Sequence, residues 1–166
     1  MHKILAIDPS LTQTGWAVIS KDHDGTLGFI ASNIIKTNAK DSLPFRLSEI
    51  SRAFNKIIND YQPDEVAIEE VFINNNPLSS LKLGHARGAI IAACSMENLQ
   101  VYEYAARLVK KSIVGTGSAQ KQQVAMMIKI LLPNAVFKYE DESDAIAVGI
   151  THLHHKESIA NRTYTA

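Results

Sequence analysis

Cysteine is almost absent from this chain, since Cys94 is the single one among 166 residues. A lone thiol cannot form an internal disulfide, and no second cysteine offers the spacing of a metal site. Cys94 lies within the apolar stretch GAIIAACSM, so we expect it to be a small core residue. The sequence therefore excludes a disulfide-stabilised secreted scaffold.

Two further features are missing. Lys plus Arg equals Asp plus Glu at 17 each, so the chain has no net charge, and only local patches can indicate a nucleic-acid partner. No apolar run reaches the roughly 18 residues of a membrane span, and the N-terminal MHKILAIDPS lacks the apolar stretch of a signal peptide. We therefore expect a cytoplasmic protein without a membrane partner.

The length of 166 residues fits one domain with a sizeable core, and 46% hydrophobic and 20% charged residues are ordinary for a globular chain. We expect a single domain over residues 1–155 and a polar C-terminal tail over 156–166. No repeat or linker interrupts this range.

Hydrophobic periodicity predicts a mixed series of strands and helices. Three apolar runs indicate an antiparallel meander, and the later strands should return parallel to the first after their crossovers. The expected class is α/β, with a five-stranded mixed sheet flanked by helices. The expected strands are 3–8, 14–20, 27–37, 65–72 and 99–104, and the expected helices are 42–61 (capped by Ser42), 76–96, 118–133 and 141–155.

Acidic residues end two of the expected strands. Asp8 ends the first strand and Glu69 lies near the end of the fourth, and the carboxyl ends of neighbouring parallel strands meet at one sheet edge. Taken alone, an Asp before Pro is most often turn chemistry. Glu69 and Glu70 point to opposite faces of their strand, so one of them must turn toward a covered face, where an unpaired carboxylate is costly.

A second acidic cluster, EDESD at residues 140–144, opens the last expected helix. Acids in a first helical turn favour the positive end of the helix dipole, which is a sufficient explanation for most such clusters. Asp141 and Asp144, however, are three residues apart and share one side of the helix. We expect Glu140 and Glu142 to be the solvated part of the cluster and the two aspartates to face the sheet.

Asp8, Glu69, Asp141 and Asp144 together are four carboxylates without an obvious balancing cation next to them in the sequence. Such hard oxygen ligands suit Mg²⁺ or Mn²⁺. Two of these ions side by side stabilise the attacking and leaving oxygens of an in-line phosphoryl displacement. The set therefore indicates nuclease-like chemistry.

Four stretches in one order resemble the RuvC family of Holliday-junction resolvases. They are IDPSLTQTGWAVI, AIEEVFINNNPLSSLKLGHARG, YEYAARLVKKSIVGTGSAQKQQV and DESDAIAVGITHLH. The resemblance runs from residue 3 to about 155. It implies an RNase H-like (retroviral-integrase-like) fold and a homodimer that resolves four-way DNA junctions in recombination and DNA repair. The implied reaction is a pair of symmetric, metal-dependent nicks in strands of like polarity, leaving 5′-phosphate and 3′-hydroxyl ends.

The resemblance also implies roles for single residues. The four catalytic, metal-binding acids of the family correspond to Asp8, Glu69, Asp141 and Asp144, with two Mg²⁺ per site that Mn²⁺ can replace. The junction-stacking aromatic corresponds to Phe72, and basic DNA contacts correspond to Lys110 and Lys121. Glu70 is expected beside the site without a ligand role, and a RuvA–RuvB-type branch-migration complex is the implied partner.

Two interpretations compete with this one. DPSLTQTGWAV also resembles the phosphate-binding hairpin of sugar kinases and actin, but those proteins need a second such domain, for which 166 residues leave no room. A junction-binding scaffold without activity is the non-enzymatic alternative, and the four intact acids argue against it.

His152, His154 and His155 resemble a metal cluster, but we expect them at the surface or the helix end.

Overall fold

The computed structural model of the chain describes residues 1–70 and 76–159, and side chains as far as residue 156. One sheet of five strands in the order β3-β2-β1-β4-β5 forms the middle layer. The strands are β1 (His2–Asp8), β2 (Gln13–Lys21), β3 (Leu27–Lys36), β4 (Glu65–Glu69) and β5 (Gln100–Tyr104). β1, β2 and β3 pair antiparallel, whereas β4 runs parallel to both β1 and β5. This confirms the predicted mixed sheet.

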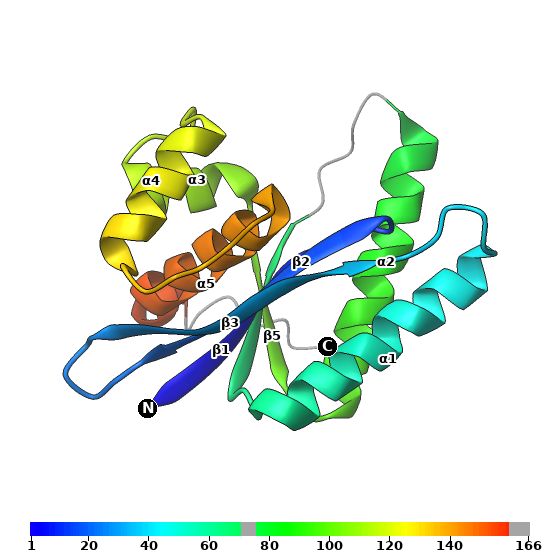
Figure 1. Cartoon of the computed structure of the whole chain (residues 1–166), viewed down its shortest axis with the longest axis horizontal. Coiled ribbons are helices and arrows are strands. Elements are labelled where there is room, and N and C mark those ends of the chain that lie inside the picture. Colours follow the sequence, from blue (N-terminus) through cyan, green and yellow to red (C-terminus); the bar gives the residue numbers. More distant parts are fainter. Residues whose placement is uncertain (71–75, 160–166) are drawn as a thin grey trace.

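Helices cover both faces of the sheet (Figure 1). The helices are α1 (Leu43–Tyr61), α2 (Pro77–Met96), α3 (Ala106–Val114), α4 (Lys121–Leu131) and α5 (Glu140–Ile159). α1 and α2 pack on one face over a core that includes Ile7, Phe54 and Ile90, and α3, α4 and α5 pack on the other over Ala6, Ala67 and Ile146. The molecule is thus a three-layer α/β/α sandwich.

The alternation of side chains along the central strands explains the two cores. Leu5 and Ile7 of β1 face α1 and α2, and Ile4 and Ala6 face α5. Asp8 continues the second series at the end of β1. The strand therefore delivers this carboxylate to the face that α5 covers.

Several predicted boundaries need correction. The sequence analysis did not predict α3, because only Val109 and Ile113 mark its apolar face and two lysines lie between them. The helix ends at Gly115, which has a left-handed φ of 87°. α4 begins at Lys121 instead of residue 118, because Gln120 and Gln123 form a reciprocal cap there. β4 ends at Glu69, three residues before its predicted end, and α5 continues to Ile159 beyond the predicted residue 155.

Smaller expectations have mixed outcomes. Cys94 is buried, as predicted, and Trp16 on β2 is buried as well. Ser42 stands at the N-cap position of α1, but its side chain makes no capping hydrogen bond. Within the described part of the chain, none of the helices is long and apolar enough to cross a membrane.

Candidate active site

Two strand ends and one helix start bring the predicted acids together. β1 and β4 lie side by side in parallel, with Ile7 paired to Ile68, so Asp8 and Glu69 leave neighbouring strands at the same edge. The first turn of α5 lies over that edge. Asp8, Glu69 and Asp144 line one cavity of about 300 Å³, together with Lys110 and Lys121.

Asp141, the fourth predicted acid, is held beside this cavity. Gln13 at the start of β2 donates a hydrogen bond from Nε2 to Oδ2 of Asp141. Gly15 lies opposite Asp8 in the β1–β2 ladder, and a Cβ on Gly15 would overlap the carbonyl group of Asp141. A glycine is therefore required where β2 passes the first turn of α5.

The acids are partly buried, and they repel one another. Burial raises the pKa of Asp8 to about 8, and the negative charges of Glu69, Asp144 and Asp141 add to the rise. Burial and the charge of Asp144 likewise raise the pKa of Glu69 to about 7, although Lys110 and Lys121 lower it. Burial also raises the pKa of Asp144, which is 24% exposed, despite its ion pair with Lys121. This edge of the sheet is thus short of positive charge.

Among the described residues, Lys121 forms an ion pair with one of these acids. Its Nζ lies 3.3 Å from Oδ2 of Asp144 and 3.0 Å from Oε2 of Glu140. Lys110 lines the same cavity, and its charge acts on Glu69 without an ion pair in the described residues. Both lysines predicted to contact DNA therefore lie at the acids, one on α3 and one at the start of α4.

The carboxylates have the chemistry of a site for hard divalent cations, which prefer oxygen ligands. Within the parts of the chain that the structure describes, no three His, Cys, Asp or Glu side chains are already arranged as a metal centre. Asp8, Glu69 and Asp144 nevertheless share one cavity, and their raised pKa values show the electrostatic strain that a cation would relieve. The residues fit such an ion chemically.

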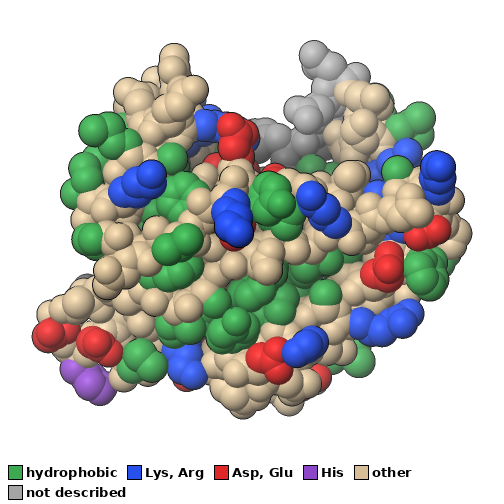
Figure 2. All heavy atoms as spheres, in the orientation of Figure 1, with side chains coloured by type: hydrophobic (Ala, Val, Ile, Leu, Met, Phe, Trp, Pro, Cys, Tyr) green, Lys and Arg blue, Asp and Glu red, His purple; other side chains and the backbone are tan. Residues whose placement is uncertain are grey.

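Figure 2 shows this region from outside. Acidic side chains with a basic side chain beside them lie at the upper edge, where the surface is hollowed between the lobe of α3 and α4 and the end of α2. Phe72, the predicted stacking aromatic, lies outside the described residues. Glu70 is exposed, and its N–H donates to the carbonyl oxygen of Tyr104 at 2.9 Å.

The expectation for Glu142 was wrong. Its side chain is only 5% exposed. One carboxylate oxygen accepts hydrogen bonds from the backbone N–H groups of Lys138 and Tyr139 at 2.7 and 2.9 Å, and the other accepts one from Oγ of Ser32 at 2.9 Å. Glu142 therefore ties the start of α5 to β3.

The expectation for His152 was also wrong, since it is fully buried and not at the surface. Its Nδ1 lies 2.7 Å from Oη of Tyr104, and its Nε2 lies 2.9 Å from Oε2 of Glu65. Glu65 also pairs with Lys156 at 3.0 Å and His2 at 3.1 Å. This group pins α5 to the end of the sheet that is opposite the four acids.

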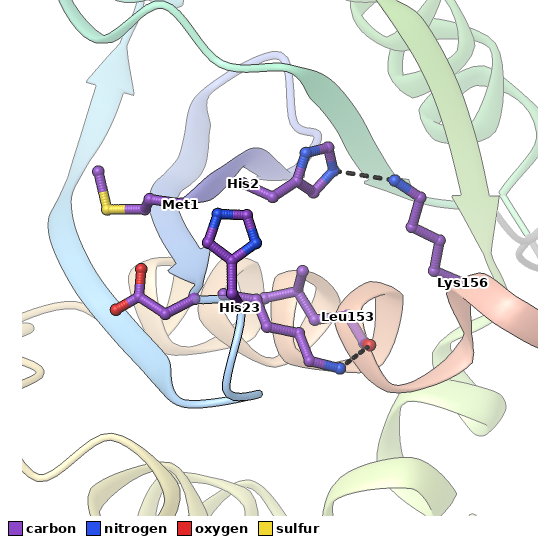
Figure 3. Close-up of a pocket in the computed structure, with 7 residues that line it drawn as sticks. Met1, His2, His23, Leu153 and Lys156 are labelled. Carbon is purple, nitrogen blue, oxygen red and sulfur yellow. Dashed lines mark hydrogen bonds between the residues drawn. The ribbon is translucent and has the colours of Figure 1, made fainter.

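A larger cavity of about 420 Å³ lies near that opposite end (Figure 3). Its two lysines are engaged within the protein: Lys156 lies 3.0 Å from Nε2 of His2, and Lys21 donates to the carbonyl oxygen of Leu153 at 3.4 Å. None of the four predicted acids lines it. Although this cavity is larger than the one at the acids, its lining does not support a catalytic role.

Comparison with known proteins agrees with this geometry. The family model of crossover junction endodeoxyribonuclease RuvC matches residues 4–152. A relative of that name from Gluconobacter oxydans is 48% identical over 162 residues, which is 97% of this chain and 95% of the relative. Another from Paramagnetospirillum magneticum is 46% identical over 154 residues, covering 93% and 92% of the two chains.

Solved structures show the same fold. Thermus thermophilus RuvC superposes with a TM-score of 0.85 at 26% identity, covering 94% of this chain and 96% of that one. The same bacterial protein in complex with a Holliday junction substrate gives a TM-score of 0.84 at 23% identity, with the same coverage. The five-stranded sheet and its helices are therefore those of an RNase H-like nuclease.

Proposed function

The chain belongs to the RuvC family of crossover junction endodeoxyribonucleases, and on that premise we propose that it resolves four-way Holliday junctions as a homodimer by paired, metal-dependent nicks. The observation that carries this proposal is the joint position of Asp8, Glu69 and Asp144 around one cavity, with Asp141 beside it. The relatives are named for this reaction, and the four acids could supply the oxygen ligands for its metal ions.

Asp8, Glu69, Asp141 and Asp144 would hold Mg²⁺ in this proposal, and Mn²⁺ would substitute. When bound, a pair of such ions activates water and stabilises the departing 3′-oxygen. The chain's own part is to fix the carboxylates: Asp8 and Glu69 by the sheet, and Asp141 by Gln13 and Gly15. Lys110 and Lys121 would bind the phosphates next to the scissile bond.

The proposed dimer would use the outer face of α2. Its inner face, with Ala86, Ile90 and Cys94, is buried in the core. On the outer face Leu81 and Met96 are largely exposed, and a Cβ on Gly88 would meet nothing within 4 Å. A second copy could approach this side closely, which would present two sites to two strands of one junction.

The test is cleavage of a synthetic four-way junction with each strand labelled in turn. We expect Mg²⁺-dependent nicks at symmetric positions, ligatable products and no cleavage of linear duplex. Asp8→Asn should bind the junction without cutting it, whereas Asp60→Asn on α1, which removes an exposed carboxylate far from the cavity, should cut normally. Binding by the unaltered protein without any Mg²⁺-dependent nicking would support the scaffold interpretation instead.

The dimer has its own test. Leu81→Glu should convert a dimeric species to a monomer by light scattering and lose the pairing of nicks, because a charge on a closely packed helix face is costly. Met126→Glu is the matched control, since Met126 is an exposed apolar residue on α4. An unaltered protein that is monomeric when bound to the junction would refute the dimer. A RuvA–RuvB-type branch-migration complex remains the proposed partner in the cell.

A further inference from the structure

A second, smaller cavity continues the surface beyond Lys121. It has a volume of about 190 Å³, and its lining includes Lys121, Phe137, Lys138, Tyr139 and Glu140. Lys121 also lines the cavity of the acids, so the two hollows adjoin at this side chain. A DNA strand that leaves the acids past Lys121 would therefore meet the segment 137–139.

This segment presents an aromatic ring with a cation over it. Tyr139 is 41% exposed, and Nζ of Lys36 at the end of β3 lies 4.9 Å from the centre of its ring. Lys36 and Lys138 are exposed, and neither forms an ion pair within the described residues.

The backbone under these side chains is fixed. Buried Glu142 accepts hydrogen bonds from the N–H groups of Lys138 and Tyr139 and from the hydroxyl of Ser32 on β3. Three hydrogen bonds on one carboxylate hold the segment against the sheet. Tyr139 and Lys138 are therefore positioned before any ligand arrives, which lowers the entropy cost of binding.

We propose that Lys36, Lys138 and Tyr139 form a DNA-binding subsite for the nucleotides that flank the scissile phosphate. The ring of Tyr139 stacks on a base or sugar, and the two ammonium groups bind the neighbouring phosphates. Glu140 also lines this cavity, but its carboxylate is paired with Lys121 at 3.0 Å. The subsite rests on the proposed function, because it would bind the same DNA strand whose scissile phosphate lies at the acids.

The experiment measures junction binding and nicking separately. Fluorescence anisotropy with a labelled four-way junction, in EDTA so that no strand is cut, gives Kd as a function of salt. Tyr139→Ala should weaken binding by about tenfold, whereas Tyr139→Phe, which keeps the ring, should bind nearly as the unaltered protein. The double variant Lys36→Ala and Lys138→Ala should reduce the slope of log K against log salt by about two.

Lys129→Ala provides the matched control. Lys129 also lies over an aromatic ring, that of Phe137 at 5.8 Å, but it does not line the cavity. Its loss should leave Kd unchanged. With Mg²⁺ and saturating enzyme, the nicking rate of Lys129→Ala should likewise equal that of the unaltered protein.

The outcomes separate the two proposals. If the unaltered protein binds and nicks the junction, but Tyr139→Ala and the double lysine variant bind equally well, the subsite is refuted while the proposed function stands. Equal weakening by Lys129→Ala would also refute the subsite, because the effect would then be one of general charge. Failure of the unaltered protein to bind any junction would refute the proposed function, and the subsite with it.

Discussion

Removing one of the four acids should stabilise the metal-free protein. Asp8→Asn keeps the shape of the side chain and removes its charge from a cluster of carboxylates. The folded pKa of Asp8 is raised from 3.8 to about 8, so between these values the folded state binds more protons than the unfolded state. The stability of the unaltered protein therefore falls as the pH rises through this window, and the asparagine variant escapes that loss.

The size of the gain can be bounded. The shift to about 8 corresponds at pH 7.5 to at most about 5 kcal/mol, and at pH 5.5 to about half as much. Neighbouring carboxylates share the repulsion, and a buried amide also costs free energy. We therefore expect a gain of about 1–3 kcal/mol at pH 7.5, which is an increase in Tm of about 3–10 °C.

Thermal unfolding in EDTA at pH 7.5 and pH 5.5 measures this gain. The variant should have the higher Tm at both, with the larger difference at pH 7.5, and Asp60→Asn should show neither effect. Adding Mg²⁺ should raise the Tm of the unaltered protein and narrow the difference. An asparagine variant that is no more stable in EDTA at pH 7.5 would contradict the electrostatic account of the site.

Three further changes test other parts of the structure. Gly15→Ala should destabilise the fold by about 1–3 kcal/mol in urea unfolding, because the added Cβ displaces the backbone of Asp141. The same displacement should reduce nicking, and an unchanged nicking rate would show that the position of Asp141 does not matter for cleavage. Burial raises the pKa of Glu65, but hydrogen bonds from His152, Lys156 and His2 outweigh it and lower this pKa to about 2. The ionised carboxylate therefore stabilises the fold fully at pH values above its ordinary pKa of about 4.5, and this contribution is lost as the pH falls toward 2. Glu65→Gln should therefore cost about 1–3 kcal/mol at pH 7 and clearly less at pH 3, and an equal cost at both would disprove the linkage. Lys121→Ala should weaken junction binding and lower the slope of log K against log salt by about one, measured by fluorescence anisotropy. An unchanged slope would show that Lys121 does not contact a phosphate.

The sequence was informative where local rules decide the structure. Apolar runs located the strands, and the parallel return of β4 beside β1 follows from its helical crossover. From those two facts alone Asp8 and Glu69 are neighbours. Helical spacing likewise predicted that Asp141 and Asp144 share a side of α5.

Long-range partners were beyond such rules. His152 is buried because Glu65 and Tyr104, 87 and 48 positions away in the chain, supply its hydrogen bonds, and no local pattern reveals them. The burial of Glu142 was unpredictable for the same reason, since its partner Ser32 lies 110 positions away in the chain. Gln13 also escaped notice, because nothing near it in the sequence indicates that it meets Asp141.

The position of α5 in the chain has a consequence for biosynthesis. Asp8 and Glu69 are made early, but Asp141 and Asp144 lie on the helix that follows every strand. Until α5 is complete, the sheet face with Ala6, Ala17 and Ala67 lacks its main cover, and the acids of the sheet stand alone. A nascent chain on the ribosome would therefore contain two of the four acids that we propose as metal ligands, without the other two. Hydrolytic capacity would arise in one late step, when the last helix docks and completes the core at the same moment.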